Sequence, residues 1–196
     1  MKKTLLIPAL LLLAASAIGQ TTTAQTAPAQ TTPAQTTPAQ TAPAQTKNPV
    51  SSALRDILPG RQKDTIAAVE GMPPDKFTYK PTADQITFGH LVAHMVVANY
   101  LLCGKAADVP APKVEVKDTD TKDQLVAALK ASFDFCTDAL AKMDDSKLGE
   151  MTEGMGAQQL SRARFALGIA SNWADHYAEA AMYLRQNGIL PPTAKK

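Results

Sequence analysis

Residues 88–103 read FGHLVAHMVVANYLLC, an apolar run that contains two histidines four residues apart. The run has the length and composition of a buried helix, which we expect to begin near Ile86 and to stop at Gly104, since glycine is common just past a helix end. A buried imidazole without a hydrogen-bond partner or a metal costs about 1–3 kcal/mol of folding free energy. His90 and His94 therefore imply partners elsewhere in the chain.

Three further segments show helical periodicity on either side of this run. The first of them contains Pro59 and is expected to break or bend there. Two short segments with alternating apolar residues, 77–79 and 114–116, are the only candidates for strands, and neither has a useful length. The pattern predicts an all-α fold, a four-helix up-down bundle with crossover loops. The three additional helices are expected over about Val50–Gly71, Thr119–Met143 and Gln158–Asn187.

The N-terminus has the three parts of a secretory signal peptide. Two lysines supply a positive charge, residues 5–15 form an apolar run, and Ala17 and Gly19 are small residues ahead of a cleavage site. The apolar run is shorter than the roughly 20 residues of a membrane span, so no membrane anchor is expected after cleavage. We therefore expect residues 1–19 to be removed and the protein to be exported to the periplasm or the extracellular space.

A repetitive segment follows the signal. Residues 21–45 are five pentads, TTTAQ, TAPAQ, TTPAQ, TTPAQ and TAPAQ, without charged, aromatic or large aliphatic side chains. Such a composition buries too little apolar surface to fold, which predicts a disordered Thr/Ala/Pro/Gln-rich linker over residues 20–49. The linker is either a tether or glycosylated stalk, or a solvated spacer without a role of its own. Residues 50–193 then form one folded domain of common size.

The charge balance of the chain argues against nucleic acid as a partner. Lys2 and Lys3 are two of the 20 basic residues and all 18 acidic residues follow the signal, so the mature chain has 18 basic and 18 acidic side chains. A neutral domain lacks the basic face that binds nucleic acid or anionic lipid. A homodimer is compatible with a bundle of this kind, and the sequence does not specify a substrate.

Cys103 and Cys136 are the two cysteines of the chain. They fall on the expected second and third helices, and export to an oxidising compartment favours a disulfide between them. Such a bond would close a loop of 32 intervening residues and stabilise the fold by about 3–4 kcal/mol. The alternative is a pair of buried thiols that do not meet.

The three histidines all fall on expected core faces. His90 and His94 project from one side of the second helix, and His176 lies on the fourth helix, one turn after Asn172. Imidazoles on facing helices are typical of metal sites in bundles. Asp175 and Glu179 flank His176, and either carboxylate is a candidate metal ligand or a hydrogen-bond partner that orients a ligating histidine. The alternative is that these are core histidines satisfied by hydrogen bonds.

Three segments resemble signature segments of the DinB-like superfamily (DinB/YfiT-like proteins). Residues 175–192, DHYAEAAMYLRQNGILPP, resemble its C-terminal motif, and residues 87–94, TFGHLVAH, resemble its first metal-binding helix. Residues 72–81, MPPDKFTYKP, resemble the loop before that helix. The resemblance covers residues 51–192 and implies a four-helix bundle that commonly binds nickel or zinc through three histidines.

The resemblance assigns the metal ligands residue by residue. His94 and His176 take two ligand positions, whereas the third falls on Asn172, and an amide is a poor ligand for nickel or zinc. His90, one turn before His94, is a candidate for the missing imidazole. With this incomplete set we expect an exported, non-catalytic or vestigial bundle that binds a divalent metal or a small ligand. The alternative is a metal-dependent transferase or isomerase in which the metal lowers the pKa of a thiol substrate.

Overall fold

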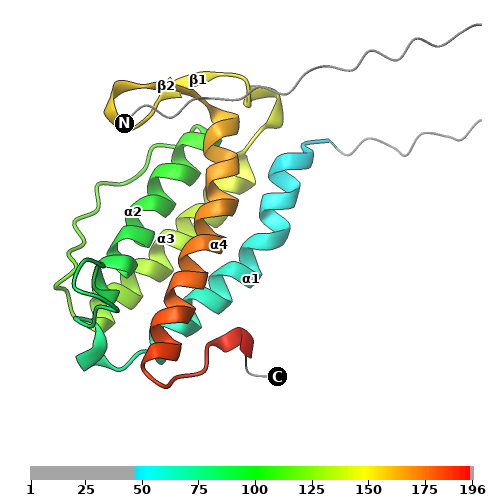
Figure 1. Cartoon of the computed structure of the whole chain (residues 1–196). Coiled ribbons are helices and arrows are strands. Elements are labelled where there is room, and N and C mark those ends of the chain that lie inside the picture. The colour runs from blue at the N-terminus through cyan, green and yellow to red at the C-terminus, as the bar shows by residue number, and fades with distance from the viewer. Residues whose placement is uncertain (1–46, 195–196) are drawn as a thin grey trace, which may run out of the picture. The chain divides into compact units, whose positions relative to one another are not determined.

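The computed structural model describes residues 47–194, which form a bundle of four long helices (Figure 1). The all-α bundle expected from the sequence is confirmed. The predicted signal peptide, and all but the last three residues of the predicted linker, lie outside the described residues. The elements are α1 (Pro49–Gly71), α2 (Phe88–Ala107), α3 (Lys122–Lys142), α4 (Arg162–Gln186), the strands β1 (Met151–Glu153) and β2 (Gln159–Ser161), and four short 3-10 turns at Pro74–Lys76, Asp145–Lys147, Met155–Ala157 and Pro192–Ala194.

Each helix packs against two others and lies diagonal to the fourth. α2 contacts α3 and α4, and α1 contacts the same two helices, so the order around the bundle is α1, α3, α2, α4. α1 and α4 run in one direction, and α2 and α3 run in the other (Figure 1). Because α2 and α3 are parallel, the chain between them, residues 108–121, has to return along the whole length of the bundle.

Aromatic side chains fix the start of α2 against the end of α4. The ring of Phe88 lies 5.2 Å from that of Phe77 and 5.7 Å from that of Tyr183, measured between centroids. The Tyr183 hydroxyl also donates a hydrogen bond of 2.7 Å to the carbonyl of Ile86. These contacts set the register between α2 and α4. Within the part of the chain that the structure describes, none of the helices combines the length and the apolar character needed to cross a membrane.

The expected end of α2 at Gly104 is wrong. The helix continues to Ala107 and ends at Asp108, which adopts the left-handed conformation (φ 59°, ψ 40°). Gly104 has a packing role instead, because a Cβ atom at this position would lie 2.8 Å from the carbonyl oxygen of Val109. The chain that leaves α2 therefore folds back closely over its last turn.

Pro59 does not break α1, which is one continuous helix. A proline inside a helix removes one backbone hydrogen bond and costs about 3 kcal/mol. Pro59 and Gly60 are exposed, whereas Leu54 and Leu58 are buried in the bundle. Packing of this apolar side holds the helix together across the weak point, since tertiary contacts supply most of the stability of a protein helix.

The strands of the described chain do not lie in the two segments where alternating apolar residues made them candidates. β1 and β2 pair antiparallel between α3 and α4, with Thr152 opposite Leu160, whereas residues 77–79 and 114–116 form no strand. Because β2 takes residues expected in the fourth helix, α4 starts only at Arg162. The hairpin is thereby placed beside the end of α2 (Figure 1).

The N-terminus of α1 is capped by a residue far away in the sequence. The side chain of the preceding residue, Asn48, gives no cap hydrogen bond to the helix. Instead the Asp145 carboxylate accepts hydrogen bonds from the backbone N–H groups of Val50, at 2.6 Å, and Ser51, at 3.0 Å. A negative charge is also favourable at this end of the helix dipole. Asp145 thus joins the start of α1 to the chain that follows α3.

We expect Asp145→Ala to lower the free energy of unfolding by about 1–2 kcal/mol, because two helix donors lose their acceptor. Urea unfolding at pH 7, followed by circular dichroism, measures the change. Asp144→Ala is the matched control, since that carboxylate accepts from Ser146, two residues away on the same segment, and we expect a clearly smaller loss than in Asp145→Ala. Equal losses in the two variants would contradict the long-range cap.

Candidate functional site

His94 and His176 come together where α2 packs against α4. Their ring centroids are 4.8 Å apart and their planes are nearly perpendicular, at 83°. His94 is exposed, and the His176 side chain is 18% exposed. The expectation that all three histidines face the core is therefore wrong for His94, and also for His90, which is exposed as well. The two imidazoles therefore lie where α2 meets α4 and are accessible to solvent.

Glu179 holds one nitrogen of His176. The Nδ1 atom of His176 lies 2.9 Å from the Oε2 atom of Glu179, one turn further along α4. When Nδ1–H donates to this carboxylate, Nε2 keeps its lone pair and can bind a metal. The same carboxylate–imidazole arrangement orients histidine ligands in metal sites. The other acidic neighbour named from the sequence, Asp175, is exposed.

The environment of His94 favours its neutral form. The part of the exposed His94 ring that lies against the bundle is shielded from water, which lowers its pKa, and the neighbouring imidazoles of His176 and His90 lower it further, while Glu179 acts in the opposite direction. A pKa below the ordinary value of about 6.5 leaves the ring unprotonated at pH 7. His94 can therefore offer a nitrogen lone pair at neutral pH.

His90 has a partner of its own on the chain that follows α2. Its Nδ1 atom lies 3.6 Å from the Oδ2 atom of Asp118, and the two side chains are 51% and 49% exposed. His90, His94, Val97 and Lys117 line an open groove of about 390 Å³. The structure thus brings His94 and His176 into ring contact and places His90 at the rim, beside a carboxylate.

Comparison with known families and structures identifies the bundle. The family model described as DinB superfamily matches residues 58–180, more than half of the chain. The chain belongs to the DinB superfamily. A crystal structure of a DinB-like protein from Bacillus subtilis matches with a TM-score of 0.57 and 16% identity, covering 69% of this chain and 92% of that one. At this identity the likeness shows the DinB-like fold alone. A comparison with curated proteins gives no match.

The third ligand position of the DinB-like pattern, Asn172, does not complete a metal site. Asn172 borders, with Thr65 and Trp173, a packing gap too small to hold a water molecule, and neither His94 nor His176 borders that gap. Across residues 47–194, no group of three or more His, Cys, Asp or Glu side chains is placed to hold a metal ion. The donor set therefore does not fit the three-histidine site that the DinB resemblance implies. What remains is one pair of imidazoles.

Behind this pair of the DinB-like bundle lies a buried polar network that the sequence analysis did not single out. The Asn99 side chain donates to Ser132 Oγ at 3.0 Å and accepts from Trp173 Nε1 at 2.8 Å. The three residues belong to α2, α3 and α4, and all are buried. The one local signal was a polar residue in the apolar run of α2, which does not reveal its partners.

Proposed function

We propose that the protein is an exported, non-catalytic DinB-like bundle that binds a divalent metal ion weakly through His94 and His176. The observation that carries the proposal is the contact of these two imidazoles, which occupy two ligand positions of the family and whose ring centroids are 4.8 Å apart. A catalytic site of this type needs three protein ligands and one open position. With Asn172 at the third position, the pair supplies binding without the geometry that activates a bound substrate.

Export is supported by two independent features. The N-terminus has the pattern of a signal peptide, and Cys103 is joined to Cys136 by a disulfide. Structural disulfides persist in oxidising compartments and are rare in the cytosol. The alternative function, a thiol-using transferase or isomerase, would depend on low-molecular-weight thiols of the cytosol. An exported domain is separated from them, which favours the binding function.

The proposal predicts a metal-dependent gain in stability. We expect excess Ni²⁺ or Zn²⁺ to raise the melting temperature of the mature, untagged chain by several degrees at pH 7.5, since a metal at 100 times its Kd adds about 2.7 kcal/mol. His94→Ala and His176→Ala should each abolish the rise. Differential scanning calorimetry and elemental analysis of the same samples give the two readouts.

His90→Ala is the matched control for this experiment. It removes an imidazole from the same helix, but one whose partner is Asp118, and we expect the metal response to persist. No response in the parent, or an equal loss in all three variants, would contradict binding by His94 and His176. Transfer of a thiol to an electrophile by the metal-loaded parent would contradict the non-catalytic assignment.

A further inference from the structure

A second concave site lies near the C-terminal end of α2, away from the histidines. This pocket, which we call the α2-end pocket, has a volume of about 280 Å³ and is lined by the last turns of α2, the chain after it, β1 and the start of α4. Gly104 forms part of its lining. Because Gly104 follows His94 by ten residues, the two lie about 15 Å apart along the helix. The pocket is therefore separate from the histidine pair.

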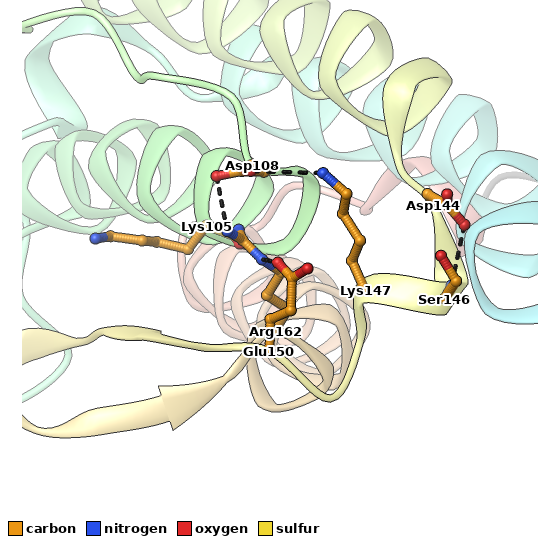
Figure 2. A network of polar contacts seen from close by, with 7 residues as sticks. All are labelled: Lys105, Asp108, Asp144, Ser146, Lys147, Glu150 and Arg162. Carbon is orange, nitrogen blue, oxygen red and sulfur yellow. Dashed lines mark hydrogen bonds and ion pairs between the residues drawn. The ribbon is translucent and has the colours of Figure 1, made fainter.

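One wall of the α2-end pocket is fixed by the buried side chain of Arg162, which is 10% exposed. Its guanidinium forms an ion pair with Asp108 Oδ1 at 2.7 Å and donates a hydrogen bond of 3.0 Å to Glu150 Oε2 (Figure 2). A second hydrogen bond, of 2.8 Å, goes to the backbone carbonyl of Lys105. Buried ion pairs give little net stability compared with apolar packing. The effect of Arg162 is to hold the end of α2, the hairpin and α4 in one arrangement.

The remaining walls are also held in place. Gly104 lets the carbonyl of Val109 pass close to α2, and the neighbouring Cys103 is bonded to α3. The ring of Tyr100 packs on that of Phe135, with centroids 5.1 Å apart. A pocket with fixed walls does not lose conformational entropy when a ligand enters, which favours binding.

Lys105 gives the α2-end pocket its charge. The two positive charges of Arg162 and Lys147 are balanced by the two carboxylates with which they pair, those of Asp108 and Glu150. None of the ion pairs formed among residues 47–194 includes Lys105. The Lys105 ammonium points away from the Arg162 cluster (Figure 2). The lining thus combines one uncompensated positive charge with the hydroxyl of Thr152 and an apolar wall made of Leu101, Val109, Pro110 and Ala111.

We infer that the α2-end pocket binds a small organic carboxylate, with the carboxylate on Lys105 and a compact apolar body against the wall around Val109. The volume of the pocket lies near the lower limit of small-molecule sites, roughly 300 Å³, and admits one ring or a short chain. A cationic ligand would meet the charge of Lys105, and a purely inorganic anion would leave the apolar wall unused. The inference does not depend on metal binding by the histidines.

Benzoate and its neutral analogue benzamide test this inference. Each is titrated into the mature chain, and the amide signals are followed by ¹H–¹⁵N NMR. We expect benzoate to bind with a Kd on the order of 1 mM, a reasonable affinity for a ligand of this size, and to shift the amides of Gly104 and Val109. Benzamide should bind about tenfold more weakly, because its neutral carbonyl can accept a hydrogen bond from the ammonium but brings no negative charge to pair with it.

Two lysine variants make the assignment specific. Lys105→Met keeps the aliphatic stem and removes the charge, and it should weaken benzoate about tenfold and benzamide clearly less. Lys113→Met is the matched control, an exposed lysine in the chain that follows α2 and that does not line the pocket. The inference would be overturned if the two ligands bound equally well, or if Lys105→Met left the benzoate affinity unchanged. It would also be overturned if benzoate shifted only amides of the groove of His90 and Lys117, or none at all.

Discussion

Loss of the disulfide between Cys103 and Cys136 should lower the free energy of unfolding by about 3–4 kcal/mol. The bond joins α2 to α3 across a sequence separation of 33 residues, and both cysteines are fully buried. In the chain-entropy account, a closed loop of this length reduces the freedom of the unfolded chain and so raises its free energy. Since whole domains are stable by only about 5–15 kcal/mol, this loss would be a large part of the total.

Three samples separate the effect of the bond from the effect of packing. They are the oxidised parent, the parent unfolded and refolded in reductant, and the double variant Cys103→Ala/Cys136→Ala, each compared by urea unfolding. The reduced parent keeps its sulfur atoms, so its difference from the double variant reports packing alone. Reductant should leave the stability of the double variant unchanged. A reduced parent as stable as the oxidised one would contradict the prediction.

The bundle could be predicted from periodicity, but the ends of its helices could not. Gly104 has the local appearance of a stop signal, and its actual role depends on the carbonyl of Val109, which only the folded chain brings near. The start of α4 was predicted too early because the segment 158–161 belongs to a hairpin whose partner strand is β1. In both cases a tertiary contact overrides a local propensity, and a sequence window does not contain that contact.

The histidine pair could be predicted only in part, because α2 has no clear solvent side in its sequence. Buried residues make up 12 of the 20 positions of this helix, so its periodicity does not mark which face is exposed. The resemblance to the DinB-like pattern nevertheless selected His94 and His176, which the structure brings into contact. The α2-end pocket had no comparable signal, since Arg162 begins α4 whereas its partner Asp108 follows the end of α2, and the sequence suggests a surface position for each of these charges.

Asn99→Leu should lower the free energy of unfolding by about 2–3 kcal/mol. The substitution keeps the branching and the number of heavy atoms of the side chain and removes both hydrogen bonds that the Asn99 side chain makes in the core. The indole N–H of Trp173 then has no acceptor, and a buried unsatisfied donor costs about 1–3 kcal/mol. Ser132 loses less, because its hydroxyl still donates to the carbonyl of Leu129 at 2.8 Å.

A double-mutant cycle isolates the contact between Asn99 and Trp173. Trp173→Phe removes the N–H donor, so the penalty of Asn99→Leu should be smaller in that background, with a coupling energy of about 1 kcal/mol or more. Ser132→Ala is the matched control from the other side of Asn99, and its own loss should stay near 1 kcal/mol. Strictly additive losses of Asn99→Leu and Trp173→Phe in urea unfolding would contradict the prediction.

The same variant connects the core network to the histidine pair. Asn99 lies five residues after His94 on α2, and Trp173 lies three residues before His176 on α4, so the hydrogen bond between them helps to set how these helices lie against each other. Asn99→Leu should therefore weaken the metal-dependent rise in melting temperature, although it touches neither imidazole. Asp145→Ala, which acts at the distant start of α1, should lower stability and leave that rise unchanged. If both variants reduced the metal response equally, general destabilisation and not helix register would be the cause.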